Sequence, residues 1–219
     1  MPPESPWPDP PETHGIQLHV KDIERGDNQE LAIDGNTENG IMVDANQAVG
    51  ISMVDIQLQD VEITSNGENG IAMRTVGSTD GNNDDLIWFK NLLIEENNDD
   101  GIDLSEDFAN TGIKMTAIQS NLNAANGLWI GSAASFGARV DPAESSNIHI
   151  YSLSSFSQNG EHGISIEQLN GGMSLTSEYI TISENTGNGI EVAAPNEASE
   201  GDIVQLYLDG CTIRDNLLH

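Results

Sequence analysis

Aliphatic and polar residues alternate in short runs along this chain, and the runs return at regular intervals. One run precedes each Asn-Gly, Asp-Gly or His-Gly pair and another follows it, as Ile63 precedes and Ile71 follows Asn69-Gly70. Alternation with a period of two, carried by β-branched residues, indicates strands that bury one face. A third apolar run, such as the one at Ile87, comes before the next pair. Each repeat therefore predicts strands joined by a sharp corner, and no stretch keeps helical spacing.

The corners share one motif. An Asn leads by four residues to a Gly, the residue before that Gly is Asn, Asp or His, and an aliphatic residue follows. The leading Asn and the Gly of the copies are Asn36 and Gly40, Asn66 and Gly70, Asn97 and Gly101, Asn123 and Gly127, Asn159 and Gly163, and Asn185 and Gly189. Asn, Asp and His are enriched at positive φ, and Gly accepts it without steric cost. We therefore expect the backbone to bend at the pair that ends in Gly.

Successive corners, counting Gly15, lie 25 to 36 residues apart, a period typical of a solenoid. One coil cannot bury its own apolar face, so the coils must stack and equivalent side chains must form columns. We expect a ladder of leading Asn amides bonded from coil to coil. We also expect one aliphatic column of Ile41, Ile71, Ile102, Leu128, Ile164 and Ile190. The sequence thus predicts an all-β fold, a single-stranded parallel β-helix of about seven coils.

The Asn-x-x-Asn-Gly-Ile repeats, for example Asn66 to Ile71, resemble those of the right-handed parallel β-helix proteins of the pectin-lyase-like class, particularly the NosD-like repeat proteins of prokaryotes. The resemblance covers roughly Gly15 to the C-terminus. It implies a right-handed coil and an extracellular or cell-surface setting. It does not imply one activity, because that class includes polysaccharide lyases, hydrolases, epimerases, adhesins and spike proteins.

The chain divides into two regions. Residues 1–13 carry six of the eight prolines together with Trp7, which predicts either a linker or an extended arm that docks on a neighbouring subunit. Residues 14–219 form the predicted β-helix domain.

Both ends of this domain fall inside a repeat when they are placed on the corner template. It starts with the second half of the motif at His14-Gly15 and stops with the first half, at Asn216 and His219. Two explanations stay open. The sequence was cut from a longer protein, or incomplete coils at both ends meet head to tail, with Trp7 as an anchor, and build a filament.

Acidic residues dominate the charge of the chain. It has 36 acidic and 7 basic residues, for a formal net charge of −29 at pH 7. Nucleic-acid binding needs clusters of Lys and Arg, so the charge argues against it and against anionic membranes. No apolar run is long enough to insert into a bilayer. An acidic surface is expected where salt screens repulsion. We interpret the chain as a prokaryotic protein of a saline, halophilic or marine, environment, and an acidic mesophilic protein as the alternative.

A calcium site is one candidate for the densest acidic stretch. Calcium takes about six to eight oxygen ligands from carboxylates and carbonyls. A solvated acidic face is the alternative interpretation. The candidate metal ligands are Glu95, Glu96, Asp99, Asp103, Glu106 and Asp107.

A carbohydrate site is the candidate for the rows that face outward after the corners. An indole such as that of Trp129 can stack on a sugar ring, and the alternative is that a loop from Gly131 covers it. The candidate residues are Trp129, Asp103, Glu167 and Glu191. Arg74 is the only cation in these rows, whereas a lyase needs a cation or a metal to neutralise a uronate.

His162 raises the question of catalysis. Glu161-His162-Gly163 is similar to the Gly-His-Gly segment of polygalacturonase-type glycoside hydrolases, but Ala125-Asn126 stands where those enzymes have their second acidic pair. We interpret His162 as a corner residue and predict no catalytic set.

Two functions remain. The first is an extracellular structural or adhesive β-helix subunit that associates end to end. The second is a module that binds or degrades polysaccharide, or a fragment of a larger surface or spike protein.

Overall fold

The computed structural model describes residues 14–21, 31–44, 51–74, 85–105, 111–131, 148–167, 173–193 and 204–217. These residues form two sheets in which every strand is parallel to its neighbours, and no helix occurs among them. In the part of the chain that is described, no helix is therefore long and apolar enough to cross a membrane.

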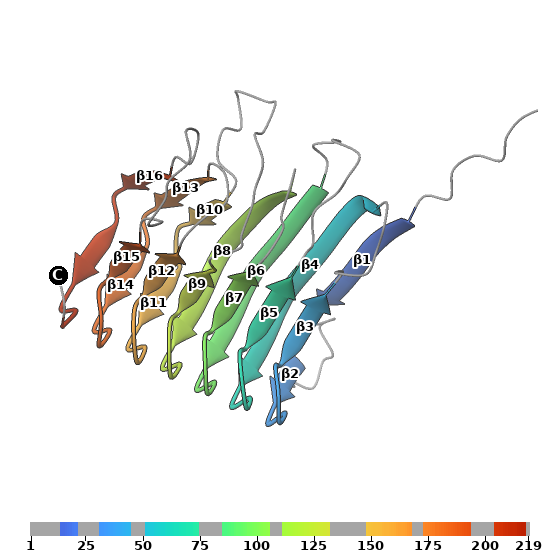
Figure 1. Ribbon diagram of the computed structural model, residues 1–219, viewed down its shortest axis with the longest axis horizontal. Helices are drawn as coiled ribbons and strands as arrows, with labels where there is room; N and C mark the ends of the chain where they lie inside the picture. The colour runs from blue at the N-terminus through green and yellow to red at the C-terminus, as the bar shows by residue number, and fades with distance from the viewer. Residues whose placement is uncertain are drawn as a thin grey trace, which may run out of the picture.

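The larger sheet has 11 strands and the smaller one has six, and the coils lie side by side from β1 at one end to β16 at the other (Figure 1). The long path of the larger sheet consists of β1 (His14–Lys21), β4 (Ile51–Thr64), β6 (Asp85–Glu95), β8 (Thr111–Asn121), β10 (Ile148–Tyr151), β13 (Met173–Glu178) and β16 (Val204–Asp209). Its remaining strands are β2 (Leu31–Asp34), β11 (Ser155–Ser157), β14 (Thr181–Ser183) and β17 (Thr212–Arg214). The smaller sheet consists of β3 (Ile41–Asp44), β5 (Ile71–Arg74), β7 (Ile102–Ser105), β9 (Leu128–Ile130), β12 (Ile164–Glu167) and β15 (Ile190–Ala193).

The coils stack because each strand pairs in register with the equivalent strand of the next coil. Ile71 lies opposite Ile102, and Ile102 lies opposite Leu128. The predicted aliphatic column continues to Ile41 at one end and to Ile190 at the other. Most of these side chains are buried in one continuous core that runs through the coils. The predicted all-β parallel β-helix is confirmed.

The predicted position of the corner bend is wrong. Positive φ occurs at the residue before each leading Asn and not at the residue before the Gly. The residues that bend the backbone here are Gly35, Ser65, Glu96, Leu122, Gln158, Glu184 and Asp215, with φ between 56° and 66°. A second bend lies five residues earlier, at Asp60, Asn91, Ala117, Leu153, Tyr179 and Gly210. The two bends turn each coil from one face to the next.

The corner glycines are needed for close approach between coils and not for their φ. A Cβ on Gly70 would lie 2.7 Å from the carbonyl oxygen of Gly101 and 2.6 Å from Cγ2 of Ile94. A Cβ on Gly101 would lie 2.8 Å from the carbonyl oxygen of Gly127. Contacts this short are forbidden, so any side chain would push neighbouring coils apart.

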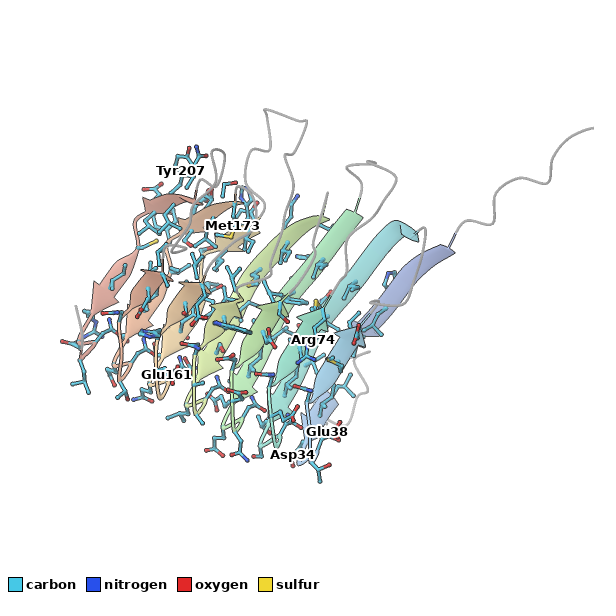
Figure 2. All side chains as sticks on the ribbon, viewed as in Figure 1. Asp34, Glu38, Arg74, Glu161, Met173 and Tyr207 are labelled. Carbon is cyan, nitrogen blue, oxygen red and sulfur yellow. The ribbon has the colours of Figure 1, made fainter. Side chains whose placement is uncertain are left out.

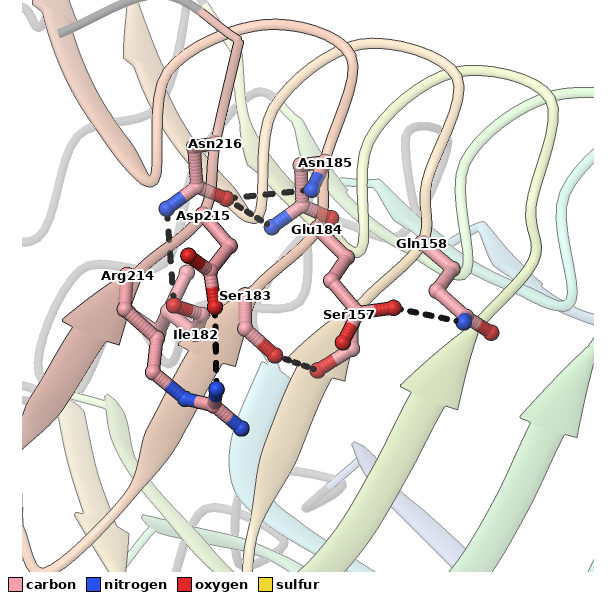
Figure 3. Close-up of polar contacts among 9 residues, drawn as sticks. All are labelled: Ser157, Gln158, Ile182, Ser183, Glu184, Asn185, Arg214, Asp215 and Asn216. Carbon is pink, nitrogen blue, oxygen red and sulfur yellow. Dashed lines mark hydrogen bonds and ion pairs between the residues drawn. The ribbon is translucent and has the colours of Figure 1, made fainter.

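The leading Asn residues form the predicted ladder. The backbone N–H and the side-chain Nδ2 of Asn66 both donate to Oδ1 of Asn97, at 3.1 and 2.9 Å. The same pair of hydrogen bonds occurs at each step from Asn36 to Asn216. Figure 3 shows the step between Asn185 and Asn216. In every step of this ladder, the donor Asn belongs to the earlier coil and the acceptor Asn belongs to the next coil toward the C-terminus.

A second ladder, which the sequence analysis missed, runs in the opposite direction. It is made by the residues before the Gly, which are Asn39, Asn69, Asp100, Asn126, His162 and Asn188. The backbone N–H and Nδ2 of Asn69 donate back to Oδ1 of Asn39, at 3.2 and 3.1 Å. Backbone N–H groups make the same bond at each later step. These residue types are therefore selected for their acceptor atoms and not for left-handed φ.

The first coil does not begin at a corner. His14-Gly15 belongs to β1, which pairs with β4, so that Leu18 lies opposite Ile56. The corner of this coil is the one at Asn36, and the prediction that the domain starts inside the motif at His14-Gly15 is wrong. At the other end, Asn216 occupies its predicted ladder position. Trp7, the arm at residues 1–13 and His219 lie outside the described residues.

We predict that Asn97→Ala lowers the free energy of unfolding by about 2 to 4 kcal/mol, because it leaves the buried N–H and Nδ2 of Asn66 without their acceptor. Denaturant unfolding followed by circular dichroism measures the loss. The control is Asn98→Ala, which removes an exposed side chain from the same corner and should change stability by less than about 0.5 kcal/mol. Equal losses in the two variants would contradict the role of the ladder.

Candidate functional site

A shallow groove of about 440 Å³ crosses the outer face of the smaller sheet. Its walls come from β5, β7, β9 and β12 and from the corners that precede these strands. Arg74 of β5 and Glu161, in the corner before β12, mark the face on which it lies (Figure 2). The carboxyl groups that line it belong to Glu68, Asp99, Asp100, Asp103, Glu161 and Glu167.

The in-register pairing of the smaller sheet brings the predicted carbohydrate residues together. Asp103 lies opposite Trp129 on the outer face of the smaller sheet. Asp103 is only 3% exposed, whereas Trp129 is partly exposed. Asp103, Trp129 and Glu167 all line the groove. Glu191, two strands along from Trp129 in the same row, is not among the lining residues. Three of the four candidates therefore share one site.

The indole of Trp129 fills the space that a side chain at position 131 would need, a feature that the sequence analysis did not find. A Cβ on Gly131 would lie 2.7 Å from Cη2 of Trp129, and Cζ2 and Cζ3 are almost as close. The six-membered ring thus lies against the backbone of Gly131, which follows the end of β9. Trp129 remains partly exposed in the groove. A partly exposed aromatic ring that lines a groove is suited to stack on a sugar.

Asp100 links the groove to the second ladder. It lines the groove, and its Oδ1 accepts hydrogen bonds from the backbone N–H and Nδ2 of Asn126, both at 2.8 Å. Burial raises the pKa of this carboxyl to about 7, because only 6% of the residue is exposed, and the charges of Asp99 and Asp103 add to the shift. The hydrogen bonds from Asn126 oppose it. Asp100 therefore changes charge near neutral pH.

The structure divides the predicted calcium ligands. Glu95 lies on β6, before the corner, where Nδ2 of Asn121 donates to it at 3.5 Å. Asp99 and Asp103 line the groove, whereas Glu95 and Glu96 do not. Among the described residues, no group of three or more His, Cys, Asp and Glu side chains is arranged to hold a metal ion. Glu106 and Asp107 lie outside those residues, so a site that includes them stays a prediction.

His162 replaces an Asn in the second ladder. Its Nδ1 accepts a hydrogen bond from the backbone N–H of Asn188 at 2.9 Å, as an Asn Oδ1 does elsewhere. Nε2 must then carry the hydrogen, and it lies 2.9 Å from a carboxylate oxygen of Glu191. Nδ2 of Asn188 donates to the same oxygen at 2.7 Å. These contacts agree with the interpretation of His162 as a corner residue.

Cys211 is partly buried, and its thiol lies 3.3 Å from the carbonyl oxygen of Ser177.

We predict that Asp100→Asn removes a pH dependence of stability. The folded-state pKa of Asp100 lies above its ordinary value of 3.8, so the stability that this carboxyl contributes is present in full below about pH 3.8 and is lost as the pH rises through 7. The advantage of Asp100→Asn over the native protein should grow from pH 4 to 7 and level off at up to about 4 kcal/mol. Unfolding free energies across this range measure it.

Asp99→Asn is the matched control, because Asp99 is exposed at the neighbouring position. It should leave most of the pH dependence in place. A constant difference between Asp100→Asn and the native protein at every pH would contradict the raised pKa.

No protein-family model matches this chain, and neither a curated protein nor a solved structure matches it.

Proposed function

We propose that this protein is a glycan-binding β-helix, a structural or adhesive subunit of a cell surface or extracellular matrix. The observation that carries the proposal is the indole of Trp129, which lies against Gly131 in a groove with several carboxyl groups. An aromatic platform supplies apolar contact with a sugar ring. Carboxylates only accept hydrogen bonds, and the hydroxyl groups of a sugar can supply the donors.

The direction of the groove supports a polymeric ligand. Its lining extends from Arg74 on β5 across Asp103 and Trp129 to Glu167 on β12. These strands belong to successive coils, so the groove follows the axis of the β-helix. A linear glycan that lies along this axis would contact several coils at once.

The charge of the groove supports a neutral glycan over a polyuronate. Arg74 is the one basic residue among the lining residues, against six carboxyl groups. The formal net charge of −29 adds a long-range repulsion of anionic polymers. The same charge supports our proposal of a saline environment, where this repulsion is screened.

Polysaccharide hydrolysis is the second candidate, and Asp100 favours it. The pKa of Asp100 is raised to about 7, and the residue lines the same groove as Asp103. A carboxyl that keeps its proton near neutral pH is the type of group that a general acid requires, with a second carboxylate as the base. The two hydrogen bonds that Asn126 donates to Asp100 give this carboxyl a structural role that competes with catalysis.

We predict that Trp129→Ala weakens binding to a neutral glycan at least about tenfold, which corresponds to about 1.4 kcal/mol of lost stacking. Affinity electrophoresis against a panel of neutral and uronate polysaccharides, followed by titration calorimetry, measures this change. The matched control is Trp88→Ala. Trp88 lies on β6 of the larger sheet, where Nζ of Lys90 is 5.4 Å from the centre of its ring. Unchanged binding in Trp129→Ala, or an equal loss in Trp88→Ala, would refute the site.

The same panel separates binding from hydrolysis. A binding protein should release no reducing ends from any polysaccharide that it retains. Turnover that disappears in Asp103→Asn would establish the degrading function instead. Absence of both retention and turnover on the whole panel would refute both candidates.

A further inference from the structure

Core positions are exposed at both end faces of the described β-helix. Ile213 of β17 is 45% exposed, although Ile182, the equivalent residue one coil earlier, is fully buried. Leu208 of β16 is 44% exposed, and an apolar groove of about 380 Å³ lies beside it and Val192. At the opposite face, Leu31 of β2 is 36% exposed, whereas its partner Val61 is buried. Both faces therefore present inward-facing apolar side chains.

The direction of the first ladder makes these faces complementary. At each step, an Asn donates from its backbone N–H to Oδ1 of the Asn in the next coil. Among the described residues, Asn36 is the first donor of this ladder and Asn216 is its last acceptor. The ladder would continue through Oδ1 of Asn36 at the first face and through the backbone N–H of Asn216 at the last. The last face thus offers the donor that the first face needs. When two copies stack head to tail, this donor meets this acceptor. When two copies meet through identical faces, donor faces donor or acceptor faces acceptor.

The register of such a stack follows from the bends. Gly35 and Asp215 both have positive φ and both precede a ladder Asn, so they are equivalent positions. Stacking Asn36 of one copy on Asn216 of another then places Ile33 on Ile213. It also places Asp34 of one copy beside Arg214 of the other, on the outside of the coils. Asp34 lies on β2 at one end of the molecule (Figure 2). Arg214 lies on β17 of the last described coil, beside Asp215 (Figure 3).

Arg214 and Asp34 are suited to this contact. Arg214 is 60% exposed in its side chain, and it lies 2.9 Å from the carboxylate of Asp215, its neighbour in sequence. Asp34 is exposed as well. In a parallel sheet, equivalent side chains of adjacent strands lie about 4.8 Å apart, so an Arg and an Asp there form an ion pair. Opposite charges therefore meet in the one register that also continues the Asn ladder.

We propose that the partner of the C-terminal face is the N-terminal face of a second copy of this chain, and that the copies stack head to tail. The contact is made by the larger sheet and the first ladder, with β1 on β16 and β2 on β17. The smaller sheet contributes little, because β15 and β3 would be separated by the thickness of one strand. The net charge of −29 on each copy opposes stacking, so the association strengthens when salt shortens the screening length from about 10 Å at 0.1 M to about 3 Å at 1 M.

Sedimentation of the whole chain across protein concentrations and from 0.1 to 2 M NaCl tests the proposal. Association should increase with salt, and negative-stain images should show unbranched stacks of constant width. Charge reversal then tests the register at the lowest salt concentration that supports association. Arg214→Glu and Asp34→Arg should each weaken the association at least about tenfold, because like charges then face each other. The double variant should restore it to within about threefold of the native value.

Restoration distinguishes stacking from any effect inside one molecule, because Asp34 on β2 and Arg214 on β17 lie in the first and last described coils of the β-helix. The control is Glu96→Arg. It reverses an exposed charge in an inner coil of the β-helix, away from both end faces, and should leave association unchanged. Circular dichroism checks that each variant is folded. A folded protein that stays monomeric under all conditions would overturn the proposal. So would association that is indifferent to both single reversals, or that the double variant does not restore. Glycan binding plays no part in any of these outcomes.

Discussion

The hydrogen bond from one buried Asn to the next is the interaction on which this β-helix depends. The leading Asn of a corner that is stacked between two others is buried, so its polar groups need partners within the protein. The backbone N–H and the side-chain amide of Asn66 both donate to Oδ1 of Asn97, one coil further on. In the second ladder the hydrogen bonds point the other way, and Asn69 donates to Asn39 of the preceding coil. The glycines beside these ladders let the coils come close enough for both sets of bonds to form.

The same spacing creates the surface that we propose binds a glycan. Because the ladders hold the coils in register, outward side chains of successive coils form straight rows, and Asp103 comes to lie beside Trp129. Asp100 belongs to both systems. It occupies a ladder position that Asn fills in most copies. Burying a charged carboxylate there costs more free energy than burying an amide, so the pKa of Asp100 rises. A group near the groove thereby becomes sensitive to pH through a structural constraint.

Directional ladders also give the molecule two unlike ends. An Asn ladder that donates toward the C-terminal coil ends in a donor at one face and an acceptor at the other. Apolar columns have no such direction and would accept a neighbour in either orientation. The polar interactions therefore specify how a second copy can be placed, and the apolar ones supply the area that it covers. Repulsion between the acidic surfaces opposes this association, and salt weakens the repulsion by screening it.

The sequence by itself determined the repeat, the strands, the aliphatic column and the first Asn ladder, because each of these depends only on spacing within and between repeats. The outward row that includes Asp103 and Trp129 followed from the same alternation. Tertiary structure decided where the backbone bends. Leu122 has φ 56° although Leu has no preference for that region, since the stacked coils on both sides impose it. Tertiary structure also decided the partner of β1, because His14-Gly15-Ile16 has the local pattern of a corner and only its pairing with β4 shows that it is a strand. The second ladder and the packing of Trp129 against Gly131 arise from contacts between coils or side chains, which no local pattern contains.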